Sequence, residues 1–270
     1  MPLQQRPTEF AELNNVLSRL VDGAHKALGD NLVGAYLVGS FALGDADLHS
    51  DCDFIVATSG PIFPAQEGAI RRLHEDFPAE DGHWNHHLEG SYAPIDDLRR
   101  LDALGRDWLF VDHGHAEMEW SAHCNSPEHR WTLRHHGVVL TGPPVEEFAD
   151  VPPDLLRDRM RGQVPRFMTE LATWIRMDEI AWGQRYAVTT LCRMLFTVHH
   201  GTLSSKRRAL LWAAEELDPR WRELVRRAEQ ERVRGWDPAD RPEHELVEQT
   251  RRFADYATQM VRVSSAEHLS

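Results

Sequence analysis

The chain has 270 residues, enough for one or two domains, and its 41% hydrophobic content is ordinary for a protein that buries a core. Its formal net charge of -13 argues against a wide nucleic-acid-binding surface, which needs many basic residues. Such a charge suits a cationic small substrate, or serves solubility alone. No run is long and apolar enough to span a membrane, the N-terminus lacks a secretory layout, and three widely spaced cysteines form no disulfide framework, so we expect a cytoplasmic protein.

Helix and strand patterns alternate in the first 150 residues. Apolar side chains that recur every three to four residues predict a helix, whereas a short continuous apolar run bounded by glycine, serine or proline predicts a buried strand. The elements predicted in this way are, in chain order, a helix at 8–28, strands at 32–38 and 54–57, a helix at 65–77 and a strand at 88–92.

The pattern changes after Pro152 and Pro153, where helical periodicity continues nearly to the C-terminus. The sequence therefore predicts a mixed α/β N-terminal half and an all-α C-terminal half, with a boundary near residue 150. The helices predicted for the second half lie at 155–175, 187–198, 205–217, 221–232 and 243–263.

Two aspartates open the second predicted strand, in the segment GSFALGDADLHSDCDF that runs from Gly39 to Phe54. Because side chains alternate along a strand, Asp51 and Asp53 project from one face while Cys52 points away. Two carboxylates on one face are typical of a Mg²⁺ site, and Mg²⁺ bound in this way usually completes its shell with water and substrate phosphates. A lone D-x-D is also common in a solvated turn, so its neighbours decide the interpretation.

Those neighbours are Gly39 and Ser40, which follow the first predicted strand, and Ser50, which precedes the aspartates. A glycine at a strand end lets backbone N–H groups approach a phosphate, and the two serines add hydroxyl donors. Together with the aspartates, they favour a site for a nucleotide carried by Mg²⁺.

The same segment resembles the signature of the DNA polymerase β-like nucleotidyltransferase superfamily, in which Gly-Ser is followed by D-x-D on the next strand. It is similar in particular to the bacterial aminoglycoside adenylyltransferases of the streptomycin and spectinomycin type. That resemblance implies an α+β fold, with a nucleotidyltransferase domain (a mixed sheet flanked by helices) at 1–150 and a helical-bundle domain at 151–270. It also implies an enzyme that moves AMP from ATP to a hydroxyl of an aminoglycoside or aminocyclitol antibiotic, with Mg²⁺ as cofactor, and so gives resistance.

The resemblance assigns a third carboxylate to a later strand, where Glu89 in HHLEGSY is the best candidate. It implies that Glu89 is the general base on the acceptor hydroxyl and a metal ligand with Asp51 and Asp53. The alternative for Glu89 is a solvated position at a strand edge. Three other acids compete for the role but lie nearer predicted turns: Asp81, Asp96 and Asp97.

The C-terminal half carries the resemblance in LCRMLFTVHHGTLSSKRRALLWAAEELDP, residues 191–219. Arg193 and Lys206 match an arginine and a lysine that reach the nucleotide phosphates in the family. Without the resemblance, Arg193 would be interpreted as an ordinary helix arginine, and Lys206 as part of a basic turn on a solvated face. Arg207 or Arg208 could also take the role of Lys206.

The acceptor site matches less well. Trp108 corresponds to a substrate-binding tryptophan and Glu179 to one of two acids, but the position of the second acid holds Gly183, beside Gln184. Asp178 could substitute only with a different local turn. We expect the protein to bind ATP and a cationic small-molecule acceptor. We also expect a monomer without nucleic-acid or membrane partners.

Three alternatives stay open. The fold could serve a nucleotidyltransferase that acts on a different small-molecule or protein hydroxyl, which the missing acid favours. The chain could also be a non-catalytic binding protein with a relic site. Finally, the histidines of HWNHH, His83, His86 and His87, could ligate a transition metal, although no partner lies at zinc-site spacing.

Overall fold

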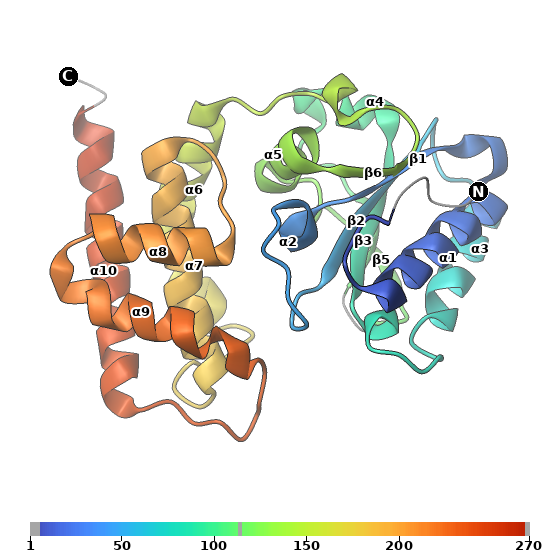
Figure 1. Ribbon diagram of the computed structural model, residues 1–270. Coiled ribbons are helices and arrows are strands. Elements are labelled where there is room, and N and C mark those ends of the chain that lie inside the picture. Colours follow the sequence, from blue (N-terminus) through green and yellow to red (C-terminus); the bar gives the residue numbers. More distant parts are fainter. Residues whose placement is uncertain (1–5, 113–114, 268–270) are drawn as a thin grey trace. The chain divides into compact units, whose positions relative to one another are not determined.

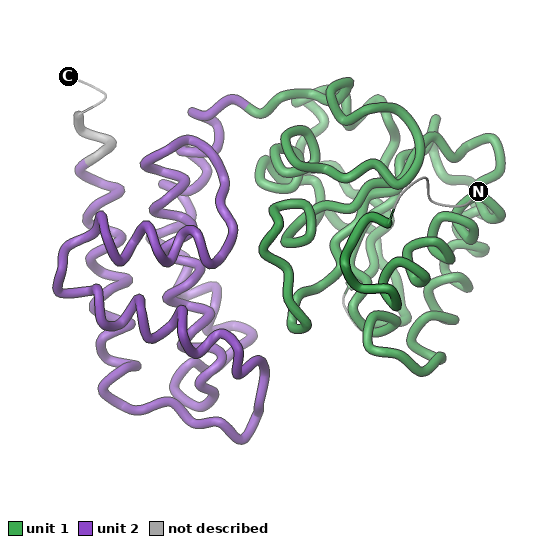
Figure 2. Tube along the Cα trace, in the orientation of Figure 1, with its two compact units in different colours: residues 1–151 green, residues 152–270 purple. Residues whose placement is uncertain are grey.

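The computed structural model describes residues 6–112 and 115–267 (Figure 1). The chain forms two compact units, Met1–Val151 and Pro152–Ser270, which we call unit 1 and unit 2 (Figure 2). The boundary predicted from the sequence lies one residue before this division. No helix in the described part of the chain is long and apolar enough to cross a membrane.

Unit 1 is built on a six-stranded sheet with strand order β5-β4-β3-β2-β1-β6. Strands β2 and β3 are parallel, and the other neighbours are antiparallel, so the sheet is mixed. The strands are β1 (Leu32–Leu37), β2 (Cys52–Thr58), β3 (Leu88–Pro94), β4 (Trp108–Val111), β5 (Met118–Ser121) and β6 (Val138–Thr141).

Helices and connecting segments cover both faces of this sheet. Along β2, Phe54 and Val56 belong to one apolar cluster with α1 and α3, while Ile55 and Ala57 belong to another cluster with Leu133 of α5. A strand buried on both faces reads as a continuous apolar run, which is why FIVA shows no alternation in hydropathy. The helices of unit 1 are α1 (Ala11–Leu28), α2 (Gly39–Ala42), α3 (Pro64–Asp76), α4 (Ile95–Leu98) and α5 (Pro127–His136), with 3₁₀ turns at Gly29–Asn31, Trp84–His86, Leu101–Ala103 and Val145–Glu147.

Unit 2 is all helical, as the periodicity predicts. Its helices pack around one apolar core, to which each contributes buried side chains such as Val164, Leu191, Ala213 and Phe253. They are α6 (Pro153–Leu171), α7 (Ala181–His200), α8 (Lys206–Glu216), α9 (Arg222–Gln230) and α10 (His244–Glu267), with 3₁₀ turns at Pro219–Trp221 and Glu231–Arg234.

The predicted fold class is confirmed, while three strands were missed. Strands β4, β5 and β6 have four residues each. Four residues contain only two repeats of the two-residue strand period, which is too few to distinguish a strand from a loop by pattern alone.

Candidate active site

The parallel register of β2 and β3 brings two of the predicted carboxylates together. Asp53 and Glu89 are direct partners across the two strands, and Cys52 is the partner of Leu88. Partners in register project from the same face of a sheet, and neighbouring strands lie about 4.8 Å apart. Cys52 is fully buried, as the alternation predicts, and the Glu89 side chain keeps 16% of its surface exposed. Asp51 lies immediately before the first residue of β2.

Gly39 allows this arrangement, because its Cα lies against the Asp53 carboxylate. A Cβ atom built on Gly39 would lie 1.8 Å from Asp53 Oδ2, and the residue has a φ of +63°. The preceding Val38 N–H donates to the Asp53 carbonyl oxygen at 2.8 Å. Both the close approach and the left-handed backbone require glycine, which is the physical reason for the Gly of the Gly-Ser pair.

The two serines behave differently. Ser40 Oγ, next to Gly39, is buried and has no hydrogen-bond partner among the described residues. Ser50, which is 4% exposed, is used inside its own turn: its Oγ accepts from the Asp47 N–H at 3.0 Å and donates to Asp47 Oδ1 at 3.2 Å. The structure therefore gives Ser50 a role in closing the loop before Asp51, in place of the phosphate contact that we predicted.

A histidine that we did not single out from the sequence completes this region. His123 Nε2 lies 3.2 Å from Glu89 Oε1. The pKa of His123 is raised above its ordinary value, first by the hydrogen bond to Glu89, against the lowering effect of burial, and further by the charges of Glu89, Asp112 and Asp53. Negative charge thus gathers at this end of the sheet.

No three His, Cys, Asp or Glu side chains within residues 6–112 and 115–267 form a cluster that could hold a metal ion by themselves. The donor set nevertheless fits Mg²⁺, which is usually bound through one or two carboxylates and completed by water and substrate phosphates. The three histidines of HWNHH do not make an alternative centre, because His83 Nε2 bonds the Leu48 carbonyl at 2.8 Å and His87 Nδ1 bonds the His83 carbonyl at 2.7 Å.

In unit 2 the predicted basic residues lie on two consecutive helices, and the Arg193 side chain reaches the segment that joins them. Arg193 of α7 donates from Nε to the Ser204 carbonyl at 3.4 Å, and Lys206 begins α8 two residues later. The Ser204 hydroxyl is buried without a partner. The two alternatives for Lys206 are engaged elsewhere, since Arg207 pairs with Glu229 at 3.4 Å and Arg208 lies 5.8 Å from the Phe196 ring.

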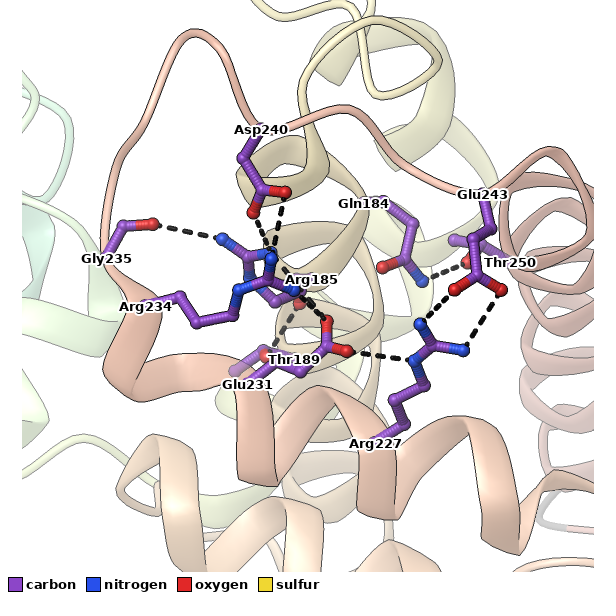
Figure 3. Close-up of polar contacts among 10 residues, drawn as sticks. All are labelled: Gln184, Arg185, Thr189, Arg227, Glu231, Arg234, Gly235, Asp240, Glu243 and Thr250. Atoms are coloured by element: carbon purple, nitrogen blue, oxygen red, sulfur yellow. Dashed lines mark hydrogen bonds and ion pairs between the residues drawn. The ribbon is translucent and has the colours of Figure 1, made fainter.

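A second polar region of unit 2 is a balanced network (Figure 3). Arg185, whose side chain is 4% exposed, pairs with Asp240 at 3.0 Å and with Glu231 at 3.8 Å, and donates to the Gly235 carbonyl at 3.0 Å. Arg227 bridges Glu231 and Glu243 beside a cavity of about 120 Å³. Each carboxylate here already has an arginine, so the network stabilises the packing of α7 and α9 with the loop after residue 235.

Comparison with known proteins decides the family of this helical unit. Residues 147–260 match the family model "Aminoglycoside adenylyltransferase, C-terminal domain". This part of the chain is therefore similar to the C-terminal domain of the aminoglycoside adenylyltransferases. The match confirms the resemblance inferred from residues 191–219 and, with it, the prediction that the chain is an enzyme of this kind.

A solved structure extends the likeness to both units of this aminoglycoside adenylyltransferase-like chain. Spectinomycin adenyltransferase AAD(9) from Enterococcus faecialis, in a crystal structure with ATP and spectinomycin, is similar with a TM-score of 0.67 at 17% sequence identity. The similarity covers 92% of this chain and 98% of that chain. At this identity the likeness concerns the fold, and it agrees with the α+β class predicted above. No curated protein matches the sequence.

Trp108, predicted to bind the acceptor, is a core residue of β4. Only 1% of it is exposed, and its indole N–H donates to Asp97 Oδ2 at 3.2 Å. The Arg130 guanidinium lies 5.7 Å from its ring. The prediction is wrong because a side chain enclosed in this way has no face left for a substrate. An exposed tryptophan of unit 1 is Trp120 on β5, at 48%.

Glu179 lies in the turn before α7, where its side chain is 55% exposed and 3.3 Å from Arg176. The same arginine bonds Asp178 and lowers the pKa of that carboxyl. Glu179 is therefore accessible to a ligand, but an acceptor cation would have to compete with Arg176 for it.

The glycine found in place of the second acid has a packing reason. A Cβ on Gly183 would lie 2.9 Å from Ile175 Cγ1 and 3.2 Å from Met177 Cα, so the first turn of α7 presses on the segment before it. The neighbouring Gln184 is 3% exposed and donates to Thr250 Oγ1 at 2.8 Å. An acid at position 183 would have to displace Ile175 and Met177. Asp178, the alternative acid, is paired with Arg176.

Proposed function

We propose that this protein is a Mg²⁺-dependent nucleotidyltransferase that moves AMP from ATP to a hydroxyl of an aminoglycoside or aminocyclitol antibiotic of the streptomycin or spectinomycin type. The observation that carries the proposal is the register of β2 and β3, which places Asp53 beside Glu89 on the face where Gly39 approaches. The family match of unit 2 supports the same reaction class.

The proposed roles follow from the chemistry of each group. Asp51 and Asp53 hold Mg²⁺, which supplies charge neutralisation on the phosphates when bound. The Gly39 backbone and the unpartnered Ser40 hydroxyl bind phosphate oxygens, and Arg193 and Lys206 of unit 2 supply further cationic contacts to the nucleotide.

Glu89 is the proposed general base. It takes the proton from the acceptor hydroxyl while that oxygen forms a bond to the α-phosphorus of ATP. The bond between the α-phosphorus and the bridging oxygen to the β-phosphate breaks, and pyrophosphate leaves with the electron pair. Positioning of the two reactants contributes most of the remaining rate enhancement.

The acceptor is proposed to be cationic because the chain carries a formal net charge of -13 and because Glu179 is accessible. A single exposed ion pair is worth only about 0.2–1 kcal/mol, so one carboxylate does not define the acceptor. Position 183 holds glycine in place of the second acid, and its surroundings are filled by Ile175 and Met177. This favours a second candidate within the same class, a nucleotidyltransferase that acts on another small-molecule or protein hydroxyl.

The test is pyrophosphate release from labelled ATP and Mg²⁺ with a panel of acceptors that includes streptomycin, spectinomycin and a protein mixture. We expect release with one of the two antibiotics. Release with the protein mixture alone would favour the second candidate, and silence with every acceptor together with an absence of ATP binding would contradict both.

Two substitutions test the roles in the same assay. Asp53→Asn should abolish turnover by weakening the metal site, whereas Glu89→Gln should lower the rate by about 100-fold or more with ATP affinity nearly unchanged. Glu119→Gln, on the exposed side of β5 in the same sheet, is the matched control and should have full activity. Full activity in Glu89→Gln would refute the assignment of the base.

A further inference from the structure

His123 contacts Glu89, the carboxylate that is the proposed general base. Its Nε2 lies 3.2 Å from Glu89 Oε1, and it reaches Glu89 from a loop 34 residues farther along the chain. Neither the family motif nor the local sequence pattern points to this contact.

The ring of His123 is held in place by its neighbours in unit 1. It stacks on Phe110 of β4, with ring centroids 4.9 Å apart and an interplanar angle of 24°. Its ring centroid lies 5.7 Å from that of His129. Phe110 is the register partner of Ser91, two residues beyond Glu89 on β3. The imidazole, which is 53% exposed, therefore has one ring face against the strand next to that of Glu89.

The loop that carries His123 is anchored by buried polar groups. Asn125 donates from Nδ2 to the carbonyl oxygens of Ala103 at 2.8 Å and Arg106 at 3.0 Å. Arg130, 1% exposed, donates from Nη1 to Asn125 Oδ1 at 3.1 Å and from Nη2 to the Leu98 carbonyl at 2.7 Å. These buried hydrogen bonds fix the backbone at Asn125, only two residues from His123.

We propose that His123 is a positioning residue for Glu89, donating a hydrogen bond from Nε2–H to Oε1 and leaving Oε2 to receive the proton of the acceptor hydroxyl. The inference rests on the proposed function, in which Glu89 is the base. The donor requires only that Nε2 carry hydrogen, which both the neutral Nε2–H tautomer and the imidazolium provide. At metal sites, loss of a hydrogen-bond partner that orients a ligand typically costs about 10- to 100-fold in metal affinity or activity, and we expect a loss of this order for Glu89.

The kinetic test compares His123→Ala with His123→Gln. The alanine variant should lose about 10- to 100-fold in kcat with the KM for ATP within about twofold of wild type, because binding of the nucleotide does not involve the ring. The glutamine amide restores an N–H donor near the Nε2 position and should recover a large part of kcat. A purely structural role would not be rescued by a side chain that cannot stack on Phe110.

A double-mutant cycle separates the role through Glu89 from any other effect. In the Glu89→Gln background, His123→Ala should cause almost no further loss of kcat, because the carboxylate that it orients is gone. The matched control is His135→Ala, which breaks another histidine–carboxylate contact of unit 1, with Asp150 at 2.7 Å, and should leave kcat unchanged.

A second readout does not depend on turnover. In the metal-free protein at mildly alkaline pH, ¹⁵N-resolved spectra of the histidine rings should show His123 with hydrogen on Nε2, and Glu89→Gln should shift that signal while leaving the His135 signal in place. An unshifted His123 signal would contradict the contact.

The outcomes for the two proposals are distinct. Active wild-type protein together with an equally active His123→Ala overturns the positioning role alone. Wild-type protein that is silent with every acceptor overturns the proposed function and the role that rests on it. Equal losses for His123→Ala in the wild-type and Glu89→Gln backgrounds would show that His123 acts independently of Glu89, which also refutes the inference.

Discussion

The carboxylates of unit 1 and the arginine network of unit 2 arrange charge in opposite ways. At the end of β2 and β3, Asp53 and Glu89 are paired in register, and Asp112 adds to the negative field that His123 experiences. Around Arg185 each carboxylate already has an arginine, and the guanidinium is almost fully buried (Figure 3).

The difference separates a site from a structural element. Backbone register holds two like charges, Asp53 and Glu89, next to each other, and under the proposed function a bound cation would stabilise this arrangement. Balanced charges that are buried together satisfy one another and act on stability. Substitutions at the carboxylate site of unit 1 should therefore change activity more than stability, and substitutions in the network of unit 2 should do the reverse.

The largest expected effect is that of Gly39→Ala on activity. The new Cβ would overlap the Asp53 carboxylate, and displacement of a reacting group by about 1 Å costs on the order of 100-fold in rate. Pyrophosphate release should fall by at least that factor. Gly44→Ala is the matched control, because Gly44 also has a positive φ, +70°, but has nothing within 4 Å of the new methyl group. It should cost about 1 kcal/mol of stability and little activity. Equal activity losses in both variants would mean that backbone strain, and not the contact with Asp53, is responsible.

The next effect is the loss of stability in Asp240→Ala. This change removes the 3.0 Å partner of buried Arg185 and leaves Glu231 at 3.8 Å, so we expect a loss of about 3 kcal/mol in urea unfolding of the full chain. Glu243→Ala removes an exposed carboxylate that pairs with Arg227, and it should change the urea midpoint of unfolding far less. Comparable losses for the two variants would contradict the distinction between buried and exposed members of the network.

Gly183→Ala sharpens the explanation for the missing acid. The methyl group would crowd Ile175 and Met177, and overpacking of this kind costs about 1–3 kcal/mol. Gly162→Ala in α6 meets nothing within 4 Å and should instead gain about 0.5–1 kcal/mol from helix propensity. If both variants were stabilised, steric exclusion would not explain the glycine at position 183.

The smallest effect is a pH dependence in the core of unit 1, where His74 bonds Tyr92 at 2.9 Å and has no ionic partner among the contacts described. Burial lowers the pKa of His74 to about 3, from an ordinary value of about 6.5. The unfolded chain therefore binds the proton first as the pH falls, so the stabilisation present above about pH 6.5 declines by about 1.4 kcal/mol per pH unit below it. Urea unfolding at about pH 7 and 5 should show this slope in wild type and a shallower one in His74→Gln. The exposed-site control His25→Gln should follow wild type; an unchanged slope in His74→Gln would assign the acid sensitivity to other groups.

The sequence by itself determined the features that depend on local periodicity. Cys52 and Asp53 point to opposite faces because side chains alternate on a strand. Gly39 was identified because a glycine at a strand end lets backbone N–H groups approach a phosphate. The helical unit followed from the 3.6-residue period over long segments. Glu89 was found through the family motif, and its position opposite Asp53 then followed from the parallel pairing of β2 with β3.

Only the tertiary structure decided which side chains meet across long stretches of chain. It enclosed Trp108 beside Arg130 and brought His123 into contact with Glu89. The physical reason is that alternation and helical period fix the direction of a side chain from its own segment, whereas burial and contact depend on what other segments pack against it.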